Sequence, residues 1–452
     1  MSRVAVLDCG KTNIKLHVAT KDGVVLETLS TRNPSLPGPP YLHHDLGGVE
    51  DWLLTALAQL GARHALTAIV PCGHGSGGVL VGPEGAVLPM MDYEQPTPAD
   101  IDAEYRTLSG SFLQRGSAIM GQATHTARQL LWMQRGWPDA VGRASAFLAL
   151  PQYWAWRLSG EAAGEVSSLG AQSGFWDVTE RRPAPIVAAC SWGALLPPAR
   201  PAWSVLGNLR PEFAARTGLD SANRIVCGVH DSTANLYRYQ AAGLADAAIV
   251  STGTWIVALN PSAPVAALDE TRGMTCNADV FGSPVPGALL MGGRAFSRIA
   301  GEGDGGTASA SLAARLIGRG TFVVGHDGLG GIAGPPPEDA ATRRTLAVLQ
   351  MALLTDVCLS TVESDAAVVL DGSFVADPLY AALVAALRPR QDVRVNASTT
   401  GVASGAALLA GHASRTKPVA LSLDAPQVLD LPALPAYRRR WADLTHQTEP
   451  RP

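Results

Sequence analysis

The first thirty residues alternate between apolar and polar positions in a way that predicts three consecutive strands. Residues 3–8 form an apolar run, which indicates a buried strand. Residues 14–18 alternate in type, so a second strand has one buried face. Asp22-Gly23 is a strong hairpin signal, and residues 24–31 supply the return strand. The chain is therefore predicted to open as a three-stranded meander.

Strands and helices alternate after this meander. Residues 50–60 carry leucines on one helical stripe, and residues 66–70 form a strand that ends in the glycine-rich segment 73–78. Near residue 247 the opening pattern returns as a strand, a Gly-Thr turn and a second strand. This alternation predicts an α/β fold. The repetition predicts a duplicated chain with two lobes, residues 1–240 and 241–452.

The second half of the chain carries clear helix signals. A strand at 367–370 runs into Asp371, and Asp377 caps a helix that has Pro378 at its first position. The small residues of 402–407 predict a helix that packs very close to a neighbour. The tail after about residue 425 lacks a clear pattern, and we expect it to wrap the first lobe or to fray.

Composition and charge exclude several classes of protein. Hydrophobic residues make up 47% of the 452 residues and charged residues 16%, which is a globular balance. The net charge of −4 gives no basic field to attract nucleic acid or an anionic membrane. No apolar run is long enough to predict a membrane span, and the chain enters a strand within three residues, which predicts no leader. The six cysteines are scattered without a CxxC pair, which fits a reduced cytoplasm and no structural zinc.

The turn after the first strand is a candidate phosphate site. Gly10 lets the backbone approach an anion closely, and the turn amides and the Thr12 hydroxyl point toward it. Asp8, at the end of the strand, can hold Mg²⁺ through its waters. The alternative is an ordinary hairpin in which Asp8 and Asn13 satisfy turn amides. The second turn, with Gly253 and Thr254, is weak alone, but two such turns can clamp a polyphosphate.

Asp231 is the candidate catalytic base. It follows an apolar strand at 225–228, and phosphoryl transfer to a hydroxyl needs a group that positions the attacking oxygen and accepts its proton. The alternative is a helix N-cap, and Ser232 or Thr233 can take that capping role instead.

Other polar residues are candidates for contacts with a sugar or a nucleotide. His230 and His74 can bind sugar hydroxyls, and a buried structural histidine is the alternative for each. Asp92 is a candidate contact to a polyol, with a solvated surface acid as the alternative. Gly372-Ser373 follows a strand and can approach a nucleotide closely, or it can be a simple strand-to-helix turn.

Taken in order along residues 3–412, these segments resemble the FGGY family of carbohydrate kinases. The matching segments are Asp8-x-Gly10-x-Thr12-Asn13-x-Lys15, Leu130–Met133, Phe147–Gly160 with Ser167-Ser168, His230-Asp231-Ser232, Ser251–Trp255, Gly372-Ser373 and Gly405–Leu409. No single segment is specific, but the set in this order is. The Thr12-Asn13 pair is closest to the rhamnulose and fuculose kinases.

The resemblance implies two ribonuclease H-like lobes of the actin, heat-shock protein and sugar kinase type, with ATP and Mg²⁺ in the cleft between them. It implies that Asp231 is the base and that Asp8 and Asp231 organise the metal. The implied ATP contacts are Gly10, Lys11, Thr12, Asn13, Lys15, Gly253, Thr254, Gly372 and Ser373. The implied substrate contacts are His74, Asp92, His230 and Ser232.

Departures from the family pattern affect the sugar side of the site. The segment Gly73–Gly77 replaces a Gly-Gln-Met-His-Gly motif, and the usual Trp-x-Asp-x-Arg survives only as the Asp92 segment. Lys11 stands where the family has a small or hydroxyl residue, which adds charge beside the phosphates. These changes leave the sugar itself open.

The sequence therefore predicts an ATP-dependent kinase of a five- or six-carbon ketose, of the L-rhamnulose, L-fuculose or xylulose type, or of a polyol. The alternative function is a non-kinase member of the same architecture, either a polyphosphate or nucleotide hydrolase or a nucleotide-driven sugar-binding regulator. The expected partner is a small-molecule sugar. A homodimer is compatible with the sequence, which does not fix the oligomeric state.

Overall fold

The computed structural model of the chain describes residues 3–301, 306–326 and 329–448, which fall into two compact units. Unit 1 comprises Met1–Ala245, Cys276–Pro284 and Thr400–Ala420, and unit 2 comprises Asp246–Thr275, Val285–Thr399 and Leu421–Pro452. The chain first passes from unit 1 to unit 2 after Ala245, five residues beyond the predicted boundary at 240. Two later segments differ from the predicted division, because they return to unit 1.

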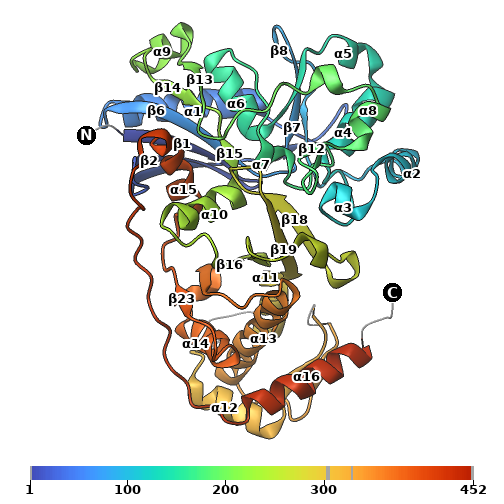
Figure 1. The fold of residues 1–452 in the computed structure, drawn as a ribbon, viewed down its shortest axis with the longest axis vertical. Helices are drawn as coiled ribbons and strands as arrows, with labels where there is room; N and C mark the ends of the chain where they lie inside the picture. The colour runs from blue at the N-terminus through green and yellow to red at the C-terminus, as the bar shows by residue number, and fades with distance from the viewer. Residues whose placement is uncertain (1–2, 302–305, 327–328, 449–452) are drawn as a thin grey trace. The chain divides into compact units, whose positions relative to one another are not determined.

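Unit 1 is built on the predicted meander. β1 (Arg3–Cys9), β2 (Asn13–Thr20) and β3 (Val25–Arg32) pair antiparallel, and β6 (Leu66–Gly73) lies parallel to β1 (Figure 1). The strand order is β13-β14-β6-β1-β2-β3, and β15 pairs with β6. The added strands are β13 (Val205–Asn208), β14 (Arg224–Val226) and β15 (Val229–His230). The predicted meander and the α/β class are confirmed.

Helices cover both faces of this sheet because β1 is apolar on both sides. Ala5 and Leu7 belong to a core shared with α1 (Leu46–Gly61) and α6 (Leu150–Ser159). Val4 and Val6 belong to a second core, shared with α10 (Asp231–Ala241) and α15 (Gly401–Leu409). In Figure 1 the red-orange α15 lies beside the blue β1 and β2, although it comes from the far end of the chain.

The predicted close packing of the small-residue helix is confirmed. A Cβ added at Gly405 of α15 would lie 1.8 Å from the carbonyl oxygen of Ala234 in α10, so the two backbones meet where only glycine fits.

The remaining elements of unit 1 are short and surround this sheet. They are β4 (Ser35–Leu36), β5 (His43–His44), β7 (Gly78–Gly82), β8 (Gly85–Ala86), β9 (Met90–Met91), α2 (Ala99–Leu108), α3 (Phe112–Arg115), α4 (Thr126–Gly136), α5 (Pro138–Gly142), β10 (Ala146–Ala149), α7 (Val166–Leu169), β11 (Trp176–Asp177), β12 (Arg182–Pro183), α8 (Pro185–Ala189), a 3₁₀ turn at Gly193–Leu195, α9 (Pro211–Thr217) and a 3₁₀ turn at His412–Ser414.

Unit 2 has its own mixed sheet, in the order β18-β19-β17-β16-β22-β23. The strands are β16 (Ala248–Thr252), β17 (Trp255–Leu259), β18 (Met274–Ala278), β19 (Pro284–Met291), β22 (Val368–Gly372) and β23 (Val393–Val395). The other elements are α11 (Gly293–Ala300), α12 (Ala310–Arg319), β20 (Phe322–Val323), β21 (Ile332–Ala333), α13 (Ala340–Thr361), α14 (Pro378–Leu387), α16 (Leu434–Thr448) and 3₁₀ turns at Val265–Ala267, Glu270–Arg272 and Ser373–Ala376.

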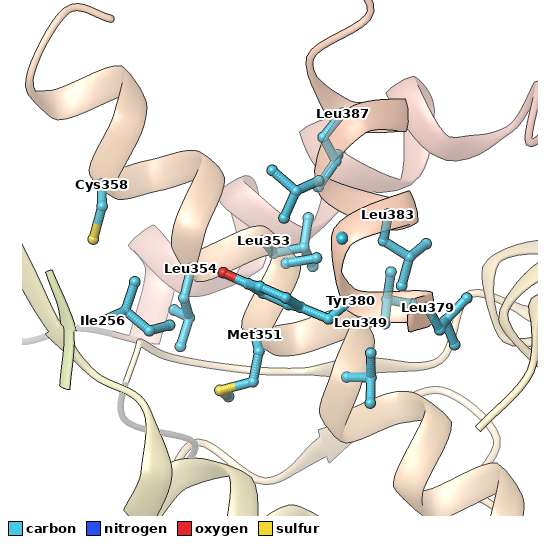
Figure 2. Packing of buried hydrophobic residues seen from close by; sticks show 14 of the residues in the cluster. Ile256, Leu349, Met351, Leu353, Leu354, Cys358, Leu379, Tyr380, Leu383 and Leu387 are labelled. Atoms are coloured by element: carbon cyan, nitrogen blue, oxygen red, sulfur yellow. The ribbon is translucent and has the colours of Figure 1, made fainter. Parts of the chain in front are cut away.

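The core of unit 2 lies around the long helix α13. Figure 2 shows Leu349 and Leu353 of this helix beside Leu383 and Tyr380 of α14. The buried Tyr380 hydroxyl lies 2.7 Å from that of Thr355, which satisfies both polar groups. The predicted start of α14 is confirmed, because the Asp377 side chain accepts from the Leu379 N–H.

The expectation for the C-terminal tail was wrong. Residues 434–448 form α16 and belong to unit 2, where Leu434, Tyr437 and Trp441 are buried. The Tyr437 ring stacks on Phe322 at 4.4 Å, and the Trp441 Nε1–H donates to the carbonyl of Val323 at 2.8 Å. The signal was the spacing of these three residues, which places them on one helical stripe. Among the described residues no helix has the length and hydropathy that crossing a membrane requires.

Candidate active site

Parallel strand pairing brings the two candidate acids of unit 1 to one edge of its sheet. Both β1 and β15 pair with β6, so that Asp8 and Val229 lie opposite the same residue, Cys72. Asp231 follows β15 directly and begins α10. Strand spacing separates the ends of β1 and β15 by about 10 Å. Burial raises the pKa of the Cys72 thiol, and the negative charges of Asp8 and Asp231 raise it further.

The first predicted phosphate turn is held by a buried asparagine. The Gly10 N–H donates to the carbonyl of Asn13 at 3.1 Å, which closes the turn. The Asn33 Nδ2 donates to the carbonyl of Gly10 at 2.9 Å, and the Asn33 N–H donates to the carbonyl of Thr12 at 2.9 Å. Thr12 and Asn13 remain exposed, as anion binding by this turn requires.

Asp231 lies at the start of α10 with 29% of its side chain exposed. Its Oδ1 accepts from the Ser232 hydroxyl at 3.1 Å and lies 3.1 Å from Nε2 of His230. His230 is the N-cap residue and makes no side-chain cap hydrogen bond, so none of Asp231, Ser232 and Thr233 takes the capping role offered as the alternative. The Thr233 hydroxyl instead donates to the carbonyl of Ala278 at 3.1 Å.

The glycine-rich segment packs closely against the ring of His230. A Cβ at Gly75 would lie 2.6 Å from the Ala171 side chain and 3.3 Å from Nε2 of His230. The backbone conformation at Gly75 is ordinary, so close approach rather than turn geometry requires a glycine there.

His74, in the same segment, is half-buried, with both ring nitrogens inaccessible, and stays neutral near pH 7. Burial lowers the pKa of this histidine to about 4. Neither ring nitrogen has a hydrogen-bond partner among the described residues, and the ring meets Tyr93 edge-on at 5.3 Å. A buried polar group without a partner is rare, so both nitrogens are available to a ligand.

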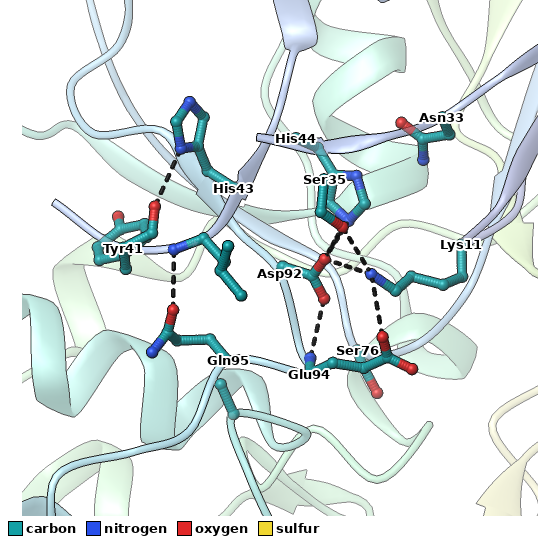
Figure 3. Close-up of polar contacts among 12 residues, drawn as sticks. Lys11, Asn33, Ser35, Tyr41, His43, His44, Ser76, Asp92, Glu94 and Gln95 are labelled. Atoms are coloured by element: carbon teal, nitrogen blue, oxygen red, sulfur yellow. Dashed lines mark hydrogen bonds and ion pairs between the residues drawn. The ribbon is translucent and has the colours of Figure 1, made fainter. Parts of the chain in front are cut away.

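Lys11 and Asp92, predicted on the ATP side and the sugar side, form an ion pair (Figure 3). The Lys11 Nζ also donates to the Ser35 hydroxyl at 3.0 Å and lies 3.6 Å from Oε2 of Glu94. Asp92 is buried, and its Oδ1 accepts from the Glu94 N–H at 2.9 Å. The charge of Lys11 is therefore engaged by the Asp92 segment rather than free in the phosphate turn.

The acids at the sheet edge fit a magnesium ion that is held mostly by water and phosphate. Asp8 is partly exposed, and its Oδ2 lies 3.9 Å from Nε2 of His17. In the part of the chain that the structure describes, no group of three or more His, Cys, Asp or Glu side chains could hold a metal directly. Mg²⁺ keeps several waters and needs only one or two carboxylates beside phosphate oxygens, a requirement that Asp8 and Asp231 meet.

The second predicted turn lies beside Gly372 in unit 2. β16 and β22 are parallel, with Thr252 opposite Gly372. The buried Thr252 hydroxyl donates to the carbonyl of Asp371 at 2.8 Å and accepts from the Phe374 N–H at 3.0 Å. Gly372 has φ of +93°, and a Cβ there would lie 2.1 Å from the carbonyl oxygen of Thr252. The structure thus brings together the predicted contacts Gly253, Thr254, Gly372 and Ser373.

The start of α11 fixes the other side of this turn. The N–H groups of Gly292 and Gly293 both donate to the carbonyl of Thr254 at 3.0 Å. A Cβ at Gly293 would lie 2.8 Å from the carbonyl oxygen of Gly253. The turn itself stays open, because a Cβ at Gly253 would meet nothing within 4 Å.

An aromatic pocket of about 400 Å³ begins next to Ser373. Phe296 and Phe374 line it with centroids 5.7 Å apart, and Tyr380 meets Phe374 edge-on at 5.7 Å. The Arg344 guanidinium lies over the Phe296 ring at 5.7 Å. Flat aromatic faces in a pocket suit a purine base.

Sequence reasoning missed three parts of the site. Asn33 pins the first turn, Glu165 supports the strand before Asp231, and the aromatic pocket adjoins the second turn. Glu165 carried a signal, since it caps α7 directly before the Ser167-Ser168 pair. The other two depend on contacts between segments far apart in the chain, which no local pattern reveals.

Comparison with known proteins covers nearly the whole chain. The N-terminal domain of the FGGY family of carbohydrate kinases matches residues 4–237, and the FGGY C-terminal domain matches residues 244–418. The L-fuculokinase of Escherichia coli K12 is 26% identical over 293 residues. That match covers 61% of this chain and 60% of the relative, so it spans about three fifths of that protein.

Solved structures of similar proteins extend over the full length. A carbohydrate kinase from Novosphingobium aromaticivorans has a TM-score of 0.89 and 30% identity, covering 99% of this chain and 100% of its own. Xylulose kinase from Rhodospirillum rubrum has a TM-score of 0.79 at 18% identity, covering 98% of each chain, and shows the shared fold. The two matched domains and the full-length structural similarity show that the chain belongs to the FGGY family of carbohydrate kinases.

Proposed function

We propose that the protein transfers the γ-phosphoryl group of ATP to a hydroxyl of a five- or six-carbon ketose or polyol, of the L-fuculose, L-rhamnulose or xylulose type. The observation that carries this proposal is the placement of Asp231. Its carboxylate is partly exposed at the sheet edge that also holds Asp8, and His230 and Ser232 fix its orientation.

Asp231 serves as the base in this reaction. Its free oxygen accepts the proton of the acceptor hydroxyl and aligns that oxygen for attack on the γ-phosphorus. Because the Ser232 hydroxyl and the His230 ring bind the other oxygen, the carboxylate cannot rotate freely. His74 and His230 contribute hydrogen bonds to acceptor hydroxyls.

The two turns hold the phosphates, and the aromatic pocket holds the base. The exposed polar groups of Thr12 and Asn13 in unit 1 and of Thr254 in unit 2 bind phosphate oxygens, and Gly10 and Gly253 let the backbone approach them closely. Lys15 adds a positive charge at the end of the first turn. Ser373 lines the aromatic pocket and Gly372 directly precedes it, so these two residues contact the ribose in this proposal. Asp8 and Asp231 would hold Mg²⁺, which would supply positive charge to neutralise the phosphate oxygens.

The family match favours the kinase over the non-kinase alternative, and one assay separates them. ADP release is measured with Mg²⁺ and ATP, with and without each sugar of a panel of ketoses and polyols. A kinase releases ADP only with an acceptor and yields a phosphorylated sugar. A nucleotide hydrolase or a nucleotide-driven regulator releases ADP at the same rate with every sugar.

Substitution of Asp231 tests the assigned base. We expect Asp231→Ala to lower kcat by about a hundredfold or more, which is the usual loss when a general base is removed. Asp139→Ala, an exposed acid in the same unit, is the matched control. Sugar phosphorylation by Asp231→Ala at the rate of the control would reject the assignment.

The cellular setting follows from the chemistry. All six cysteines are free, which suits the reducing cytoplasm where ATP is available. A homodimer is part of the proposal, and the mass of the protein in solution tests it.

A further inference from the structure

The ammonium of Lys11 is the positive charge held among the carboxylates that surround the proposed acceptor site. It forms an ion pair with Asp92, donates to the Ser35 hydroxyl at 3.0 Å and lies 3.6 Å from Oε2 of Glu94. The Tyr93 ring covers the same ammonium at 5.3 Å. The charge of Lys11 is therefore paired within the chain itself.

Asp92 is anchored as firmly as Lys11. Only 2% of its side chain is exposed. One oxygen accepts from the Ser35 hydroxyl and from Lys11, and the other accepts from the Glu94 N–H. His44 Nε2 lies 3.8 Å away. A ligand that drew Lys11 away would leave a buried carboxylate without its counter-charge, which is strongly unfavourable.

This cluster belongs to the same space as Asp231. The His74 ring lies against Tyr93, and the charges of Asp231 and Lys11 both act on the pKa of His74. Burial raises the pKa of the Tyr93 hydroxyl, and the negative charges of Glu94, Asp92 and Asp231 raise it further. The cluster therefore lies close enough to the base for their charges to act on the same two side chains.

The charge balance of this space is negative. Lys11 supplies one positive charge, whereas Asp92, Glu94 and Asp231 supply three negative ones. Burial lowers the pKa of His44, His74 and His230, so these rings add no positive charge near pH 7. A carboxylate on the acceptor would meet carboxylates and a lysine that is already paired.

We propose that Lys11 is a specificity-determining residue of the acceptor site and that its pairing with Asp92 and Glu94 selects an uncharged sugar or polyol over a carboxylated one, such as an aldonate or a uronate. This inference rests on the proposed kinase activity. It gives Lys11 a role on the acceptor side. Because the Lys11 ammonium donates to Asp92, it cannot pair with the carboxylate of an anionic acceptor, and such acceptors are excluded.

The first test compares acceptors on the wild-type protein. We expect kcat/KM with ATP and Mg²⁺ to be at least tenfold higher for the best of L-fuculose, L-rhamnulose, D-xylulose and xylitol than for D-gluconate or D-glucuronate. A wild-type preference for either carboxylated acceptor overturns the inference and leaves the kinase proposal intact. Absence of ADP release with every acceptor overturns the kinase proposal instead.

The second test frees the ammonium. In Asp92→Asn/Glu94→Gln the two carboxylates become neutral and Lys11 keeps its charge, so we expect the ratio of kcat/KM for D-gluconate to that for the best neutral acceptor to rise at least tenfold. Adding Lys11→Met to this variant should remove the gain. The charge-matched control is Glu84→Gln/Asp139→Asn, which neutralises two exposed acids of the same unit. A gain that persists without Lys11, or that appears in the control, contradicts the inference.

A milder variant covers the case in which the buried substitution unfolds the protein. Glu94 is 58% exposed, so Glu94→Gln should fold. We expect D-gluconate to compete with the neutral acceptor at a severalfold lower inhibition constant in this variant than in the wild type. An unchanged inhibition constant in a folded Glu94→Gln protein also contradicts the inference.

Discussion

The backbone N–H of His230 donates a hydrogen bond to the hydroxyl of Ser167 at 3.3 Å. That hydroxyl in turn donates to Oε2 of Glu165 at 2.7 Å. The Glu165 carboxylate is buried and also accepts from the two N–H groups of Ser167 and Ser168 and from the Ser168 hydroxyl. The residue before the proposed base is thus tied to a buried acid on a neighbouring short helix.

Glu165 is predicted to position Asp231 without touching the substrate. In Glu165→Gln an amide NH₂ replaces one acceptor oxygen and faces donors, which costs about 1–3 kcal/mol for an unsatisfied buried group. We expect a lower melting temperature and a kcat reduced by about tenfold, with little change in KM for ATP. Steady-state kinetics and thermal unfolding measure both effects.

The two serines separate positioning from general stability. Ser167→Ala removes the acceptor for the His230 N–H, whereas Ser168→Ala removes only a contact to Glu165. We expect Ser167→Ala to lower kcat more than Ser168→Ala at a similar melting temperature. Equal kcat values in the two variants would show that Glu165 has a purely structural role.

Gly372 is predicted to be indispensable to the fold of the second turn. Alanine there would meet the carbonyl of Thr252 at 2.1 Å in a backbone conformation that side chains rarely adopt. We expect Gly372→Ala to lower the melting temperature by several degrees, measured by circular dichroism. Gly253→Ala in the neighbouring turn is the steric control, since its Cβ meets nothing within 4 Å, and it should melt close to the wild type.

The aromatic pocket of unit 2 is predicted to bind the base of ATP. Phe374→Ala removes one wall of the pocket, and stacking on an aromatic ring contributes about 1–3 kcal/mol to the binding of a base. We expect KM for ATP to rise by roughly tenfold, the lower half of that range, and KM for the acceptor to stay within twofold. A larger change in the acceptor KM than in the ATP KM would place the nucleotide elsewhere.

His125 is predicted to make the protein less stable in mild acid. Burial, and then the charges of Arg128 and Arg115, lower the pKa of this histidine to about 3 in the folded protein. In the unfolded chain His125 binds a proton below about pH 6.5, whereas in the folded protein it stays neutral down to about pH 3. The free energy of unfolding is therefore highest above pH 6.5 and decreases as the pH falls toward 3. The loss is about 1.4 kcal/mol per pH unit below 6.5.

The variant His125→Gln tests the direction of this pH dependence. It keeps an acceptor for the Met120 N–H, which donates to Nε2 of His125 at 3.0 Å, but it does not titrate. We expect the fall in melting temperature between pH 7 and pH 5 to be smaller in His125→Gln than in the wild type. His446→Gln, which changes an exposed histidine, should leave that fall unchanged.

The parts of the fold that sequence patterns predicted are those with strong local signals. The alternation in residues 14–18 and the Asp22-Gly23 turn were enough for the meander, and Asp377-Pro378 was enough for the start of α14. α1 begins at Leu46, four residues before the predicted start at 50, because Asp45 caps it. Two glycines follow Leu46 in this first turn. The glycines hid the helix, since they are poor helix formers.

The parts that sequence patterns could not predict depend on distant residues. Lys11 and Asp92 are 81 positions apart, and nothing local to either residue indicates that they pair. The return of residues 276–284 and 400–420 to unit 1 likewise follows from packing across the chain. Candidate site residues could be named from sequence motifs, but their contacts with one another, and the support from Asn33 and Glu165, could not.

The contact between Gly405 and Ala234 means that the first unit can complete its fold only after the ribosome has synthesised α15. The sheet that carries Asp8 and Asp231 needs α15 as part of one of its two covers, and α15 follows two of the three segments of the second unit in the chain. A nascent chain released or cleaved at residue 245 would leave the apolar faces of α10 and β1 open to water. Folding of the first unit must therefore wait until residues 401–409 have left the tunnel, so products truncated before α15 are expected to aggregate.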